Sequence, residues 1–139
     1  MYSIGKNDVN YNVNEKKRTI VAYIEGIEDM FYNFVHKNYR PLRGSFLLYD
    51  PKLRMPNRFY AKAVCSKDDE WDVELGKRIA FDRLKDKINN SFFSRASYFV
   101  TEMDRHLEIF CEKVNNYGEG LTKCAEYRKN KISKELENK

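Results

Sequence analysis

Residues 72–88 read DVELGKRIAFDRLKDKI, and this stretch decides the fold. Its small and apolar residues recur every three or four positions, as on one face of an α-helix. These residues are Val73, Gly76, Ala80, Leu84 and Ile88. Asp72 stands just before them and is a favoured N-cap, because its carboxylate accepts a hydrogen bond from the first turn. The sequence therefore predicts an amphipathic helix that begins at residue 73.

A second apolar stripe follows this helix. Its members are Phe92, Ala96, Phe99, Met103, Leu107, Phe110 and Val114, and a flanking stripe contains Phe93, Val100 and Ile109. Two apolar faces on one helix indicate more than one neighbour, and we expect one of these to be a second copy of the chain. Residues 89–91 and 117–120 are rich in Asn, Ser and Gly, which disfavour helix interiors. The pattern thus predicts two or three long C-terminal helices.

The first half of the chain is typical of strands. Thr19–Ile24 is a short β-branched run that suits a central strand, and Arg58–Cys65 alternates apolar and polar residues with period two. Between them, Ile27–His36 has the spacing of a short helix. We therefore expect an α+β fold in a single domain of residues 1–139. A small antiparallel or mixed sheet occupies residues 1–66, and residues 72–137 are mainly helical.

Composition narrows the class of protein. The 139 residues include 26 Lys and Arg against 21 Asp and Glu, so the net charge is +5. No stretch of about 20 apolar residues exists, and the first residues lack the apolar core of a signal peptide, so we expect a cytoplasmic protein. Three cysteines, an odd number without a Cys-x-x-Cys pair, indicate reduced thiols rather than disulfides or a metal site. We expect no metal and no cofactor.

The sequence offers no catalytic constellation. Asp104 and His106 are two positions apart on a helix and so point in different directions. No Ser or Cys lies in a nucleophile elbow, and no glycine-rich loop is suited to phosphate. The acidic residues 68–72 precede a helix, where negative charge is favourable. We therefore expect that the protein is not an enzyme.

Several arginines lie near aromatic residues. The planar guanidinium fork suits phosphate, and aromatic faces suit a base. An ordinary ion pair, such as Glu102 with Arg105, is the alternative for each of these arginines. Phe92, Phe99 and Phe110 fit a helix core better than a base platform. The residues alone therefore indicate an α+β domain with a candidate anion site.

Two stretches carry a resemblance to a known family. The first is NEKKRTIVA at residues 14–22. The second combines residues 55–56 with RFYAKAVC at 58–65, DDEWD at 68–72 and GKRIA at 76–80. A strand that ends in Ala-x-Cys, followed by an acidic turn and a Gly-Lys helix, resembles small proteins of phages of Gram-positive bacteria. Over residues 14–110 the chain is most similar to the Thoeris anti-defence sponges of the first described type.

This resemblance implies a function in the cytoplasm of an infected bacterial host. Proteins of that family bind the cyclic ADP-ribose isomer made by TIR-domain defence proteins and hold it without cleavage. Some also trap cyclic oligonucleotides at separate sites. They combine an N-terminal sheet with C-terminal helices and have ligand pockets at subunit interfaces. The resemblance thus implies a cyclic nucleotide ligand and a homo-oligomer formed through the C-terminal helices.

For such a ligand we expect several cationic donors and aromatic faces. The candidate phosphate donors are Arg18, Arg58, Arg95 and Arg105, and the candidate stacking residues are Phe93 and Tyr98. Two other functions stay open. One is inhibition of another bacterial defence, as anti-CRISPR proteins do, although many of those are acidic DNA mimics. The other is plain nucleic-acid binding, which predicts a steep salt dependence.

Overall fold

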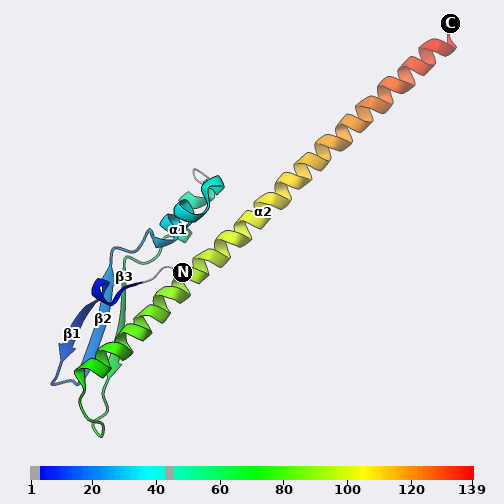
Figure 1. Cartoon of the computed structure of the whole chain (residues 1–139). Helices are drawn as coiled ribbons and strands as arrows, with labels where there is room; N and C mark the ends of the chain where they lie inside the picture. Colours follow the sequence, from blue (N-terminus) through cyan, green and yellow to red (C-terminus); the bar gives the residue numbers. More distant parts are fainter. Residues whose placement is uncertain (1–3, 43–45) are drawn as a thin grey trace. The chain divides into compact units, whose positions relative to one another are not determined.

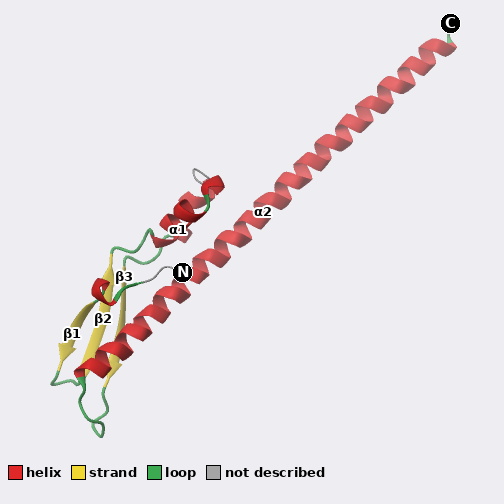
Figure 2. Ribbon diagram, in the orientation of Figure 1, coloured by secondary structure: helices red, strands yellow, loops and turns green. Residues whose placement is uncertain are grey.

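The computed structural model describes residues 4–42 and 46–139. Within these ranges, three strands form one antiparallel sheet in the order β1-β2-β3, and two α-helices follow the second and third strands (Figures 1 and 2). The elements are β1 (Asn10–Asn14), β2 (Thr19–Glu25), α1 (Met30–Asn38), β3 (Arg58–Val64) and α2 (Val73–Glu137). The predicted α+β class is confirmed. The chain divides into an N-terminal unit, Met1–Val100, and a C-terminal unit, Thr101–Lys139.

The central strand β2 holds the sheet together. Its residues alternate between the two faces, so that Ile20, Ala22 and Ile24 are buried under α2. The predicted alternation in β3 is also confirmed, since Ala61 and Ala63 lie on the same buried face. The strand β1 was not predicted, because its sequence NYNVN carries few β-formers. It forms through pairing with β2 along residues 10–14.

The predicted stripe at the start of α2 forms the core of the N-terminal unit. Ala80, Leu84 and Ile88 are at most 1% exposed, and they belong to the same apolar cluster as the inner face of the sheet. Asp72 is the expected N-cap, since its Oδ1 accepts a hydrogen bond of 3.0 Å from the Leu75 amide. Gly76 allows the helix to approach the sheet closely: a Cβ at this position would lie 2.5 Å from Cδ1 of Ile20.

An aromatic cluster attaches α1 to α2 within the N-terminal unit. The ring of Phe31 lies 5.5 Å from Phe92 and 5.5 Å from Phe99, and the ring of Phe34 lies 5.1 Å from Phe92. All three pairs have the edge-to-face geometry that favours aromatic contacts. Phe92 and Phe99 therefore act in packing, as their position in the sequence suggests. The helix at Ile27–His36 is also confirmed and begins three residues later than expected, at Met30.

The expected interruptions of the C-terminal helix are wrong. A single helix, α2, runs from Val73 to Glu137 through both residues 89–91 and residues 117–120. Ser91 does not start a new helix, because its Oγ accepts a hydrogen bond of 2.7 Å from Arg95 one turn later. Each helical glycine costs only about 1 kcal/mol, which the continuing turns on both sides offset. No helix in residues 4–42 and 46–139 is long and apolar enough to cross a membrane.

The contact between Gly76 and Ile20 is open to a double-mutant test. Gly76→Ala is expected to destabilise the N-terminal unit by about 1–2 kcal/mol, because overpacking outweighs the gain in helix propensity. Ile20→Val removes the Cδ1 that the new methyl group meets, so the double variant should lose less stability than the two single variants together. Urea unfolding of the four proteins measures this coupling, and strictly additive losses would contradict it.

Candidate functional site

Arg18 acts as a tether within the N-terminal unit. It ends the β1–β2 turn with a φ of 49°, and its guanidinium reaches across to the loop that joins β3 to α2. There it donates to the carbonyl oxygens of Lys67, at 3.3 Å, and Asp69, and to Sγ of Cys65 at 3.2 Å. Its Nε atom is buried without a hydrogen-bond partner. The guanidinium therefore organises this loop.

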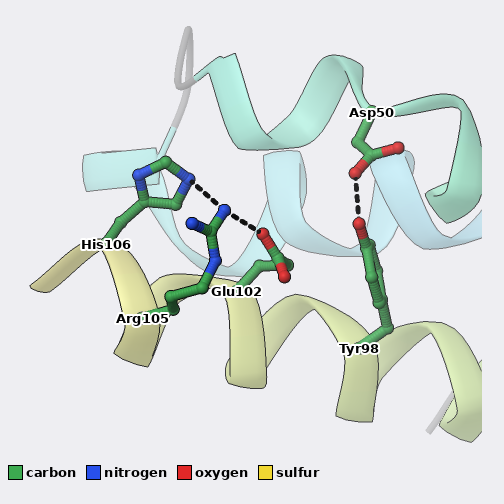
Figure 3. Close-up of polar contacts among 5 residues, drawn as sticks. All are labelled: Asp50, Tyr98, Glu102, Arg105 and His106. Carbon is green, nitrogen blue, oxygen red and sulfur yellow. Dashed lines mark hydrogen bonds and ion pairs between the residues drawn. The ribbon is translucent and has the colours of Figure 1, made fainter. Parts of the chain in front are cut away.

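Arg95 and Tyr98 meet the same segment, the one around the short 3-10 helix Pro51–Leu53. Arg95 donates to the carbonyl of Arg54 at 3.4 Å and to Ser91 on its own helix. The Tyr98 hydroxyl donates to Oδ2 of Asp50 at 2.6 Å (Figure 3). This hydrogen bond is the largest cause of a lowered pKa of the Asp50 carboxyl, followed by the backbone amide of Lys52. These two predicted ligand residues thus lie together, and both fasten α2 to this segment.

Arg105 belongs to the C-terminal unit. Its Nη2 lies 2.8 Å from Oε2 of Glu102 and 3.4 Å from Nε2 of His106 (Figure 3). The ion pair with Glu102 is the ordinary helix contact that the sequence offered as the alternative to phosphate binding. Phe93 stands on α2 beside Phe92, with ring centroids 6.0 Å apart, and its side chain is 55% exposed.

Arg58 lies on the face of the sheet that α2 does not cover. Its guanidinium sits over the ring of Tyr23, 5.0 Å from the centroid, and its Nε lies 3.2 Å from Oε1 of Glu25. The register pairs Tyr23 directly with Tyr60, whose side chain is 62% exposed. We call the residues Tyr23, Arg58, Tyr60, Lys62 and Lys87 the tyrosine face. Of the six predicted ligand residues, only Arg58 belongs to it.

Two cations from α2 reach the edge of the sheet: Lys87, which belongs to the tyrosine face, and Arg83. Lys87 donates to the carbonyl of Tyr60 at 2.9 Å and lies 5.1 Å from the centroid of its ring. Arg83 donates to the carbonyl of Lys62 at 2.8 Å. These bonds satisfy carbonyl groups of an edge strand that would otherwise invite another strand. They also concentrate positive charge next to an exposed aromatic ring.

Part of the tyrosine face can be predicted from the sequence. Alternation placed Tyr60 and Lys62 on the side opposite Ala61 and Ala63. It did not reveal which residue of β2 would face Tyr60, because the register depends on the three-dimensional pairing of the strands. The contribution of Lys87 was also missed, since it comes from α2 and becomes visible only once that helix lies along the sheet.

Two cavities formed by described residues of the N-terminal unit are lined by none of the six predicted ligand residues. The larger, of about 800 Å³, lies between the end of β3 and the start of α2. Four carboxylates line it, those of Asp69, Glu70, Asp72 and Glu74, against the single guanidinium of Arg83. The smaller, of about 370 Å³, has three carboxylates, those of Glu28, Asp29 and Asp50, against Arg54. Carboxylates outnumber cations in both surroundings, whereas the tyrosine face carries the three cations Arg58, Lys62 and Lys87.

Among residues 4–42 and 46–139, no three His, Cys, Asp or Glu side chains gather as a metal site would require. The thiol of Cys65 lies 3.4 Å from the carbonyl oxygen of Glu70 and is held within its loop. No protein-family model, curated protein or solved structure matches this chain.

Loss of the Arg18 tether should loosen the loop around Cys65. In a background with Cys111→Ser and Cys124→Ser, Arg18→Ala is expected to raise the rate at which Cys65 reacts with a thiol reagent several-fold. The same change should lower the free energy of unfolding by about 1–3 kcal/mol, since three hydrogen bonds of a charged group are lost. Lys17→Ala, which removes an exposed neighbouring cation, is the control. An unchanged Cys65 rate in Arg18→Ala would contradict the tether.

Tyr98→Phe is expected to raise the pKa of Asp50, because it removes the hydrogen bond that contributes most to the lowered value. A lowered folded-state pKa stabilises the fold above the ordinary carboxyl pKa, and this stabilisation is lost as pH falls through the lowered value. The variant should therefore lose its pH-dependent stabilisation at a higher pH. An NMR titration of the Asp50 carboxyl carbon measures the shift, with Tyr39→Phe as control. An Asp50 titration in Tyr98→Phe that is identical to that in the wild-type protein would show that the Tyr98 hydrogen bond does not lower the pKa of Asp50.

Proposed function

We propose that this protein is a phage anti-defence protein that captures a cyclic nucleotide signal and holds it without cleavage. The observation that carries the proposal is the tyrosine face, where Arg58 lies over Tyr23 beside the exposed ring of Tyr60. The resemblance supplies the ligand class, a cyclic ADP-ribose isomer, with cyclic oligonucleotides as a second group. The site of action is the cytoplasm of the infected bacterium.

The tyrosine face offers both contacts that such a ligand needs. The ring of Tyr60 is exposed and can stack with a base, an interaction that contributes about 1–3 kcal/mol per base. Arg58 and Lys62 are exposed on the same strand and can pair with phosphate. The present partner of Arg58, Glu25, is also exposed, and an exposed ion pair contributes little. A phosphate group of a cyclic nucleotide can therefore replace this carboxylate at low cost.

Capture without chemistry agrees with the groups present on the tyrosine face. Its side chains are two tyrosines, two lysines and an arginine, groups that can stack with bases and pair with phosphate. A protein that only binds must lower the free ligand concentration by mass action. It must therefore bind the signal more tightly than the cellular receptor does and be present in excess.

We also infer that the protein acts as a homo-oligomer through its C-terminal helix. The support is the exposure of large apolar side chains along residues 101–139, including Phe110 at 64% and Tyr117 at 70%. Apolar side chains clustered on a surface are typical of protein interaction sites.

A second candidate function is binding of single-stranded nucleic acid, which the same face favours. Exposed aromatic rings on an open sheet flanked by cations are a recurring platform for unpaired bases. The two functions differ in their dependence on salt and on length. Binding of a strand weakens steeply with salt in proportion to the phosphates contacted and strengthens with strand length. Binding of a small cyclic nucleotide saturates at a fixed stoichiometry.

The direct test mixes the purified chain with cyclic ADP-ribose isomers, cyclic dinucleotides and cyclic trinucleotides, and with single strands of increasing length. The protein is removed by filtration, the free ligand is quantified, and the protein fraction is then heated. One cyclic nucleotide should disappear and return intact on heating. A ligand that returns altered would indicate an enzyme. Binding that grows with strand length alone would support the second candidate function instead.

Two substitutions locate the site once a ligand is found. Tyr60→Ala and Arg58→Ala are each expected to weaken binding at least about tenfold, the equivalent of 1.4 kcal/mol, through lost stacking or phosphate pairing. Tyr39→Ala and Arg40→Ala remove the same side chains from exposed positions elsewhere and should leave the affinity unchanged. Calorimetric titration measures all four. Equal affinities for the two pairs of variants would place the ligand away from the tyrosine face.

A further inference from the structure

A regular line of apolar side chains runs along the C-terminal unit. Leu107, Val114 and Leu121 are spaced by seven residues, and so are Phe110, Tyr117 and Cys124. We call these six residues the seam. The two series are offset by three and four positions, which is the a and d pattern of a coiled coil. The same seven-residue spacing extends back from Leu107 to Val100 and Phe93. Both of these residues belong to the N-terminal unit and are exposed.

The seam has no partner within its own unit. Residues 101–139 are described throughout, and α2 is the only helix or strand that they form. The five large seam side chains are between 50% and 70% exposed, and Cys124 is exposed as well. An average period of 3.5 residues keeps such a line facing one neighbouring helix when the two helices supercoil. The pattern therefore calls for another helix with the same repeat.

We propose that the seam pairs with the seam of a second copy of this chain, in antiparallel orientation. This proposal identifies the contact of the oligomer inferred above and does not depend on the proposed ligand. Each copy would cover the exposed seam side chains of the other along residues 107–131. A second copy supplies the same repeat and the same length by symmetry.

Charge complementarity sets the orientation. Residues 101–119 contain five acidic and two basic residues, a net charge of −3, whereas residues 120–139 contain three acidic and six basic residues, a net charge of +3. Parallel pairing would bring like halves together. It would also place Arg128 and Lys131, which occupy the next two seam positions, against their own copies. Antiparallel pairing brings the acidic half against the basic half.

The seam spacing and the charges together set a register. When residue 119 marks the centre, Tyr117 faces Leu121 and Val114 faces Cys124 of the other copy. Arg128 then faces Phe110, where a cation lies over an aromatic ring. Gly118 and Gly120 flank this centre, and a Cβ at either would meet nothing within 4 Å in the single chain. Small residues at a crossing let two helices approach closely.

Light scattering on the full chain tests the association. The protein should have twice the mass of its 16.6 kDa chain. Val114→Glu places a charge in the seam and should yield monomers, while Asn116→Glu places the same charge off the seam and should leave the dimer intact. A monomeric wild-type protein at tens of micromolar, or a Val114→Glu dimer, would overturn the proposal. Circular dichroism of both variants shows whether each is folded.

Cysteine crosslinking tests the orientation of the two helices without disrupting the dimer. In a Cys111→Ser background, Val114→Cys should give a covalent dimer on mild oxidation, because residue 114 faces Cys124 of the other copy. Without Val114→Cys no covalent dimer should form, since the two Cys124 residues then lie about 15 Å apart along the helix axis. Rapid crosslinking through Cys124 alone would indicate parallel pairing and overturn the antiparallel model.

The ligand titration separates the two proposals. A Val114→Glu monomer that still binds its nucleotide would support the proposed function and show that ligand binding does not depend on the dimer. A dimer that binds no nucleotide in the panel would overturn the proposed function and leave the seam pairing intact.

Discussion

The close contact between Gly76 of α2 and Ile20 of β2 is the constraint on which the N-terminal unit depends. Because no side chain separates them, the first turns of α2 lie directly on the central strand, and Ala80, Leu84 and Ile88 follow into the core. That placement also brings Arg83 and Lys87 to the edge of β3, where they bind its carbonyls. The burial of one helix face thus determines where Arg83 and Lys87 meet the edge of the sheet.

The sequence predicted the parts of the fold that local pattern controls. Helical spacing after Asp72, the β-branched run of β2 and the alternation of β3 each led to the right element, because burial imposes its period on the residues. The strand β1 escaped prediction because its asparagines form a strand only through pairing with β2. The continuity of α2 also escaped, because propensity at residues 89–91 and 117–120 is a weak local preference that helix cooperativity overrides.

The candidate site was less predictable than the fold, for a physical reason. An arginine in a sequence shows its chemistry but not its partners. Arg18 and Arg95 became tethers because main-chain carbonyls lay within reach, and Arg105 paired with a glutamate one turn away. Arg58 remained on an open face because its strand is covered on one side only. The tyrosine face depends on the register of β2 and β3, and this register cannot be predicted from the residue pattern of either strand alone.

The helix α2 carries two lines of apolar side chains. In its first turns the small and apolar stripe meets a sheet of the same chain, and Phe92 and Phe99 meet α1. Phe93, one residue after Phe92 and so turned by about 100°, begins a separate line with exact seven-residue spacing. A helix that needed only its own domain would gain nothing from that second line. Its persistence to Leu121, with opposite charges on the two halves that follow the N-terminal unit, is the pattern that the proposed antiparallel pairing requires.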